Sequence, residues 1–192
     1  DKAGRVVDAQ PADDSYPHTI IEMFMVEANE AVAGLLDQLN VSFMRRIHPE
    51  PDGISMKNLA RVVRALGLSI PASADRWALQ ELLAAVKGTD KTLGVNLLVL
   101  RSLEKAQYAP HRVGHFALAS GHYCHFTSPI RRYADLLVHR VLEGYLRKKA
   151  VLSSQGQDLS EIGKHLSFTE QRAEDAEREL KSILILQMLS KH

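Results

Sequence analysis

The sequence predicts an α+β fold that is predominantly helical and carries a few short strands. Its 192 residues are 45% hydrophobic and 24% charged, which is typical of one soluble globular domain. Cap signals and helical spacing of apolar residues recur along most of the chain, whereas only brief segments look extended. Wholly apolar runs such as Met23–Val26 have only four residues, so no membrane-spanning segment is predicted.

The N-terminal half is predicted to be helical apart from one extended segment. Its first helix spans His18–Leu39, because Asp13-Asp14-Ser15 precede it and Pro17 suits its first turn. The later elements of this half are an extended segment at Val41–Ile47, a turn at Pro51–Gly53, and helices at Ser55–Leu66, Ser73–Lys87 and Leu93–Lys105.

The C-terminal half begins with two predicted extended segments, Val113–Ala119 and Tyr123–Phe126, joined by a hairpin turn at Ser120-Gly121. A helix then runs from Ser128-Pro129 to about Arg147, followed by a polar connector at Lys148–Gln157.

The last part is predicted as a short helix near Leu159–His165 and a separate final helix. The final helix opens with the capping box Ser167–Glu170, in which a hydroxyl and a carboxylate satisfy backbone N–H groups. Its predicted buried stripe consists of Ala173, Ala176, Leu180, Ile183 and Leu184.

The segment Thr127–Arg140 carries the most informative charges. Residues 101–150 hold nine Lys and Arg against three Asp and Glu. Ser128 suits a helix N-cap and Pro129 the first helical position, which places Arg131 and Arg132 in the first turn. A helix dipole disfavours cations there, so the two arginines predict a bound anion such as a phosphate group.

A structural interpretation of the same segment stays open. Arg131, Asp135 and His139 lie four residues apart on one helical face, so Arg131 can pair with Asp135. That order of charges is the weaker one, and it leaves Arg132 unexplained. A basic block is also common on a solvated helical surface.

Two polar residues interrupt the apolar first helix. Glu22 and Asn29 are seven residues apart, on a line that also holds Val26 and Ala33. A buried carboxylate needs a partner or a ligand, which makes Glu22 a candidate binding residue. The alternative is a glutamate near the helix end that reaches solvent.

The segment His122–His125 suggests a zinc site, but its spacing argues against one. In an extended chain His122 and Cys124 face away from His125, and no second close pair completes four ligands. We expect His125 and Thr127 to be hydrogen-bond partners beneath the arginine helix instead. Because Cys124 is the single cysteine, no internal disulfide framework exists, and a reducing compartment, the cytoplasm, is predicted.

Four segments, in order and spacing, carry a family resemblance. They are IIEMFMVEANEAVA at residues 20–33, Arg46–Pro49, Leu100–Ala119, and the long signature HYCHFTSPIRRYADLLVHR at residues 122–140. Together they resemble the ribonuclease II / ribonuclease R family of 3′→5′ exoribonucleases, whose catalytic domain is called RNB. The resemblance implies that residues 1–192 are the C-terminal part of a single RNB-type catalytic domain. A metal-binding part would lie upstream and an OB-type barrel downstream. The first residues, which are neither Met nor an apolar leader, also suggest a piece of a longer protein.

The resemblance implies hydrolysis of single-stranded RNA from its 3′ end into nucleoside 5′-monophosphates, with magnesium ions held by upstream aspartates. Arg131 matches the family's catalytic arginine, which would clamp a phosphate as charge builds. Glu22 matches a glutamate that contacts the terminal ribose. Arg132, Asn29 and His125 are candidates for phosphate contact or for support of the site.

We expect the chain by itself to bind no metal and to be inactive as an isolated fragment. Two other functions compete with the enzyme. One is a non-catalytic RNA-binding or scaffold member of the same family, which the upstream aspartates would distinguish. The other is a helical protein-interaction module, which does not explain arginines at a helix start.

Overall fold

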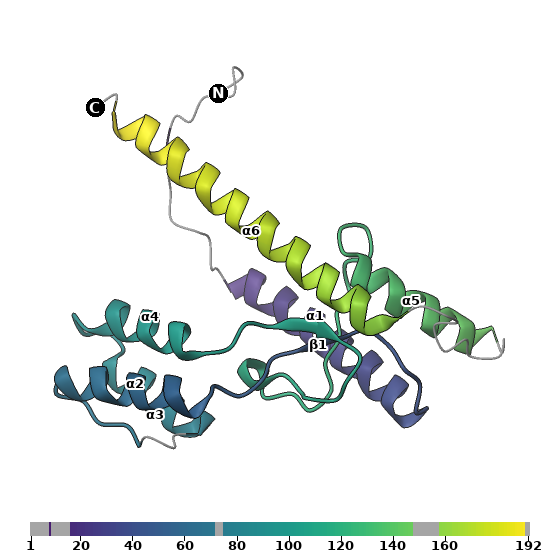
Figure 1. The fold of residues 1–192 in the computed structure, drawn as a ribbon, viewed down its shortest axis with the longest axis horizontal. Coiled ribbons are helices and arrows are strands. Elements are labelled where there is room, and N and C mark those ends of the chain that lie inside the picture. The colour runs from purple at the N-terminus through teal and green to yellow at the C-terminus, as the bar shows by residue number, and fades with distance from the viewer. Residues whose placement is uncertain (1–7, 9–15, 72–74, 148–157, 191–192) are drawn as a thin grey trace. The chain divides into compact units, whose positions relative to one another are not determined.

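The computed structural model describes residues 8, 16–71, 75–147 and 158–190. The chain divides into two compact units, of which unit 1 comprises residues 1–45, 108–110 and 124–192, and unit 2 comprises residues 46–107 and 111–123. Helices dominate the described residues and one small sheet accompanies them, so the predicted α+β, mostly helical class is confirmed (Figure 1). The polar connector predicted at 148–157 lies outside the described residues.

Unit 1 is built from three helices, α1 (Tyr16–Gln38), α5 (Tyr133–Leu146) and α6 (Leu159–Leu189). A buried ion pair between Arg45 and Asp37 ties the segment after α1 to that helix. Two small clusters form its buried core, one of Ala33, Leu36, Phe43, Cys124 and Val138, the other of Met44, Tyr108, Ala134, Leu137 and Leu159.

Unit 2 contains α2 (Gly53–Ala65), α3 (Arg76–Val86) and α4 (Thr92–Ser102), and α4 packs against both other helices (Figure 1). Asp52 caps α2, because its Oδ1 accepts hydrogen bonds from the backbone N–H groups of Ile54 and Ser55. The core of the unit consists of Met56, Leu59, Ala60, Val63, Ile70, Leu79, Leu82, Val86, Val95 and Val99.

The sheet has two strands of three residues each, β1 (Arg45–Ile47) and β2 (Gln107–Ala109). β1 lies at the end of the segment predicted to be extended. β2 was not predicted, because three residues are too few to show a strand period.

The predicted hairpin around Ser120-Gly121 is wrong. Within the predicted extended segment, residues Phe116–Leu118 form a short 3-10 helix instead. His115 explains this local structure, because its side chain accepts a hydrogen bond from the backbone N–H of Leu118 and so caps the turn. Residues 123–126 likewise contain no strand.

The two helices predicted after residue 158 form one continuous helix, α6 (Figure 1). Asp158 caps it, since its Oδ1 accepts from the N–H groups of Ser160 and Glu161. Ser167 therefore lies inside the helix, where its hydroxyl donates to the carbonyl of Gly163, and the predicted capping box is wrong. The stripe predicted to be buried is largely exposed among the described residues, for example at Leu180.

No helix among the described residues combines the length and the apolar character that crossing a membrane requires.

Candidate functional site

The turn that precedes α5 carries Arg131. α5 begins at Tyr133 with Arg132 as its N-cap residue, and the backbone N–H groups of Arg131 and Arg132 donate to the carbonyl of Ser128 at 3.3 and 3.1 Å. The prediction that Ser128 caps the helix and that both arginines lie in its first turn is therefore wrong. The helix-dipole argument does not explain the position of Arg131.

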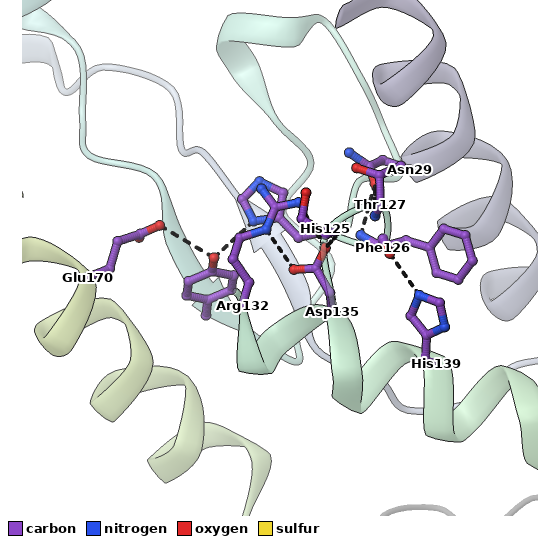
Figure 2. Close-up of polar contacts among 10 residues, drawn as sticks. Asn29, His125, Phe126, Thr127, Arg132, Asp135, His139 and Glu170 are labelled. Carbon is purple, nitrogen blue, oxygen red and sulfur yellow. Dashed lines mark hydrogen bonds and ion pairs between the residues drawn. The ribbon is translucent and has the colours of Figure 1, made fainter. Parts of the chain in front are cut away.

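Arg132 is committed to a carboxylate. Its Nε and Nη2 donate to the two oxygens of Asp135, each at 2.8 Å, and the backbone N–H of Ser128 donates to Asp135 Oδ1 at 2.8 Å (Figure 2). Asp135 is fully buried and the Arg132 side chain is 16% exposed. Asp135 thus binds both ends of the turn: Ser128 through its backbone N–H and Arg132 through a bidentate ion pair.

Asn29 of α1 holds the segment that leads into this turn. Its side-chain oxygen accepts hydrogen bonds from the backbone N–H groups of Phe126, at 2.9 Å, and Thr127, at 3.3 Å (Figure 2). Asn29 is only 3% exposed, as its place on the apolar stripe predicted. The Asn29 side chain thus satisfies two backbone N–H groups in a segment that belongs to no strand.

His139 of α5 supports the same segment from the other side. Its Nε2 lies 2.8 Å from the carbonyl oxygen of Phe126, and its ring stacks on the Phe126 ring with centroids 4.2 Å apart (Figure 2). Because a carbonyl only accepts, His139 carries its proton on Nε2 in this hydrogen bond.

His125 belongs to a third set of contacts, reaching β2 and α6. Its Nδ1 lies 2.9 Å from the hydroxyl of Tyr108, and that hydroxyl donates to Glu170 at 3.4 Å (Figure 2). A hydroxyl has one hydrogen, so the donor in the first bond is His125 Nδ1. His125 and Thr127 were expected to be hydrogen-bond partners beneath the arginine helix, and the hydrogen bond of His125 described here instead reaches Tyr108 of β2. Thr127 takes part only through its backbone, since its buried hydroxyl has no hydrogen-bond partner among the described residues.

Arg131 projects from this anchored segment into solvent. It is exposed, and the described chain offers its side chain no hydrogen bond or ion pair. The alternative in which Arg131 pairs with Asp135 is wrong, because Arg132 and the Ser128 N–H occupy that carboxylate. An unpaired guanidinium on a rigid base is suited to binding an anion.

Glu22 is not buried, contrary to its predicted place on the apolar stripe. It is exposed on the first turns of α1, where the neighbouring Ile21, Met23 and Phe24 are exposed as well. No hydrogen bond or ion pair within the described residues joins Glu22 to the arginine turn. The alternative of a solvent-facing glutamate describes this structure.

Neither cysteine chemistry nor metal binding is supported by the described side chains. Cys124 is fully buried, its thiol donates to the carbonyl of Asn29 at 3.5 Å, and burial raises its pKa to about 12. Such a thiol is a poor nucleophile and a poor metal ligand at neutral pH. Among the described residues, no three His, Cys, Asp or Glu side chains lie close enough together to hold a metal ion.

Three residues of this arrangement were not proposed as site residues from the sequence. Asp135 and His139 were recognised only as members of a polar stripe. The spacing of Arg132 and Asp135, three residues apart, contained the signal for their ion pair. Tyr108 gave no signal, because its role depends on contacts with residues far away in the sequence.

Comparison with known proteins identifies the family. The RNB domain matches residues 1–148. Ribonuclease R of Thermotoga maritima is 37% identical over 199 residues, covering 100% of this chain and 28% of that protein. Ribonuclease R of Aquifex aeolicus is 38% identical over 182 residues, covering 93% of this chain and 26% of that protein. The chain therefore belongs to the RNB family, and it spans about a quarter of the length of these curated relatives.

Solved structures agree with this assignment. Mycoplasma genitalium RNase R in complex with double-stranded RNA has a TM-score of 0.84 and 31% identity, covering 94% of this chain and 34% of that one. Yeast Ssd1, described as a pseudonuclease, has a TM-score of 0.67 and 23% identity, covering 81% of this chain and 20% of that one, which shows likeness of fold alone. That residues 1–192 form the C-terminal part of one RNB domain stays a prediction.

Proposed function

We propose that this chain is the RNA-holding part of a cytoplasmic 3′→5′ exoribonuclease that hydrolyses single-stranded RNA to nucleoside 5′-monophosphates. The observation that carries the proposal is the exposed, unpaired side chain of Arg131 on a turn anchored by Asn29, Asp135 and His139. Membership of the RNB family, with relatives named ribonuclease R, supports it.

Arg131 would bind the phosphodiester that is cleaved. A guanidinium offers paired N–H donors that match phosphate oxygens, and a fixed cation stabilises the extra negative charge of the transition state. Rigidity matters because a donor that is already in place needs no reorganisation during the reaction. The anchored turn supplies that rigidity.

Among the other candidate residues, one would contact the RNA and the others would position the Arg131 turn. Glu22 is exposed and would accept a hydrogen bond from the terminal ribose, which is one way to sense a 2′-hydroxyl. Arg132 and Asn29 are engaged with Asp135 and with the backbone of residues 126–127, so we assign them to positioning. His125 would act in the same way through Tyr108.

Magnesium, which the family resemblance implies, does not fit the side chains described here. No cluster of three or more potential ligands exists among them, and the buried Asp135 is already fully engaged. In the proposed enzyme the metal would be held by residues outside this chain. The part played by the described residues is to bind and position RNA.

Substitution of Arg131 tests the proposal in the intact protein. We expect Arg131→Ala to lower turnover of single-stranded RNA by on the order of a hundredfold or more, the scale on which loss of a preorganised charge acts. Arg147→Ala is a matched control, because Arg147 makes only an exposed pair with Glu143. Near-normal turnover of Arg131→Ala would remove Arg131 from the mechanism. We also expect the 192-residue chain alone to release no mononucleotides in magnesium buffer.

A non-catalytic RNA-binding member of the family is the second candidate. The likeness to a pseudonuclease means that the fold by itself does not distinguish the two functions. Incubating the intact protein with end-labelled RNA and magnesium separates them. Release of mononucleotides supports the enzyme, whereas Arg131-dependent binding without release supports the RNA-binding protein.

A further inference from the structure

Unit 2 contains two adjoining pockets, separate in sequence from the Arg131 turn. The first has a volume of about 390 Å³, and its lining includes His48, Arg112 and His115. The second has a volume of about 270 Å³, and its lining includes Trp77. The two pockets share Glu50, Arg76 and Phe116.

Aromatic rings form the wall of the first pocket. The ring of His48 stacks on those of His115, with centroids 5.1 Å apart, and Phe116, with centroids 6.3 Å apart. Backbone hydrogen bonds fix this wall, because His48 N–H donates to Gly114 at 3.0 Å and Phe116 N–H donates to His48 at 2.9 Å. The wall is thus built before any ligand arrives.

The positive charge at the first pocket comes from arginines. Burial lowers the pKa of His115 to about 4 and also lowers that of His48, so both rings are neutral at pH 7. Among the residues that line the first pocket there are two arginines, Arg76 and Arg112, and one carboxylate, Glu50. This balance favours an anion.

The second pocket has a different character. Trp77, the only tryptophan in the chain, is 64% exposed there, with the guanidinium of Arg76 lying 5.6 Å from its ring centroid. Its lining also includes the carboxylates of Glu50 and Asp75. Asp75 is engaged in capping α3, whereas Glu50 has no hydrogen bond or ion pair within the described chain. A base with N–H donors on its edge suits this combination of a flat ring and an acceptor.

The side chain of His48, which lines the first pocket, also has one buried polar atom, Nδ1. This atom has no hydrogen-bond partner among the described residues, although His48 is only 7% exposed. Buried polar atoms without a partner are rare in folded proteins and call for a bound water, ion or ligand.

From these observations we propose that unit 2 carries a nucleotide-binding site in which Arg112 and Arg76 hold the phosphate and Trp77 stacks on the base. The proposal extends the proposed function, since the nucleotide is either part of the RNA substrate or a free 5′-monophosphate product. Glu50 accepts hydrogen bonds from the base edge. Guanine, with two adjacent N–H donors there, is the most suitable base.

The site is tested by titrating the intact protein with GMP, inorganic phosphate and a short single-stranded RNA, without divalent metal. Base stacking quenches indole fluorescence. The Trp77→Phe variant lacks the Trp77 signal, so comparison with it separates quenching at Trp77 from quenching of any tryptophans elsewhere in the intact protein. We expect saturable quenching by GMP and RNA but not by phosphate alone. Quenching by RNA without quenching by GMP assigns the site to RNA alone, and quenching by GMP alone assigns it to the product.

Variants locate the site. Stacking on one base contributes roughly a 5- to 150-fold change in affinity, so Trp77→Ala is expected to weaken GMP binding by about that factor. Because this variant lacks the fluorescent ring, its affinity is measured by calorimetric titration alongside the wild type. Arg112→Gln should weaken it as well. Leu93→Ala and Arg64→Gln, exposed positions of the same unit that line neither pocket, should leave it unchanged.

Absence of saturable GMP and RNA binding at Trp77, or binding that survives both Trp77→Ala and Arg112→Gln, would overturn the proposal. The outcome is independent of the Arg131 test. A protein that binds GMP at Trp77 but never cleaves RNA refutes the exoribonuclease and retains this site. A protein that cleaves RNA normally but binds no ligand at Trp77 supports the exoribonuclease and refutes this site.

Discussion

Arg132 and Asp135 form a bidentate ion pair in which the carboxylate is fully buried and also accepts the backbone N–H of Ser128. The pair frees its neighbour, Arg131, from the nearest carboxylate. The two adjacent arginines of the signature segment thus have opposite environments, one folded inward and one exposed.

Asp135→Ala should be strongly destabilising. It leaves the largely buried guanidinium of Arg132 without its partner, and breaking a buried pair in this way costs about 3–5 kcal/mol of unfolding free energy. Denaturant unfolding measures the loss. Asp175→Ala is the matched control, because Asp175 makes only exposed contacts, a hydrogen bond accepted from Gln171 Nε2 at 2.9 Å and a long ion pair with Arg178, and we expect a change within about 0.5 kcal/mol. Equal losses for the two variants would show that the Arg132 pair is not structural.

Asn29→Ala should loosen the segment at residues 126–127. Two backbone N–H groups lose their acceptor, and each unsatisfied group costs about 1–3 kcal/mol when it is buried. We expect a lower unfolding free energy and faster amide exchange at Phe126 and Thr127. Asn58→Ala, at an exposed position of α2, should change neither quantity. Unchanged exchange at both amides would contradict the proposed positioning role of Asn29.

Gly163→Ala should destabilise unit 1. A Cβ atom at this position would clash with the carbonyl oxygen of Tyr108, so the backbone of β2 or α6 must move. Overpacking of this kind costs about 1–3 kcal/mol. Gly144→Ala in α5 meets nothing within 4 Å and should instead stabilise by about 0.5–1 kcal/mol, because alanine favours helix more than glycine does. Thermal unfolding that shifts both variants in the same direction would refute this pair of predictions.

Unit 2 should lose stability as the pH falls from about 6.5 to about 4. Burial, together with His48 and Arg46, lowers the pKa of His115 from 6.5 to about 4 in the folded chain. Between these values the unfolded state binds more protons, so unfolding free energy falls with decreasing pH. His115→Gln should flatten this dependence, whereas His111→Gln, at an exposed position, should leave it intact. Equal slopes for wild type and His115→Gln would exclude His115 as the cause.

The helices with local cap signals were predictable from the sequence. α1 and α2 begin within two residues of the predicted positions, where Pro17 and the capping Asp52 mark their starts. α4 also begins within one residue of its predicted position, although no side chain caps it. The start of α5 was not predictable in this way. Ser128 is a residue type that N-caps favour. Its N–H donates to Asp135 and its carbonyl accepts from the N–H groups of a turn, so the helix begins only at Tyr133. The helix start predicted at Ser167 is wrong for a similar reason, because α6 is already capped at Asp158 and runs through Ser167.

The candidate site was only partly accessible to sequence reasoning. Arg131 was identified on the premise of a helix start that the structure does not have, together with the family resemblance. Asn29 was correctly expected to be buried, whereas Glu22 was not. The contacts that organise the turn join residues almost a hundred positions apart, such as Asn29 and Phe126, and no local pattern specifies them.

The chemistry of Cys124 has a practical consequence for experiments on this chain. Its thiol is enclosed and remains protonated far above neutral pH, so maleimide and iodoacetamide reagents should leave it untouched in the native state. Cysteines introduced at surface positions of α5 or α6 would then be the sole attachment points within these 192 residues. Spin labels or fluorophores placed there would report motions of individual helices without removal of the native thiol.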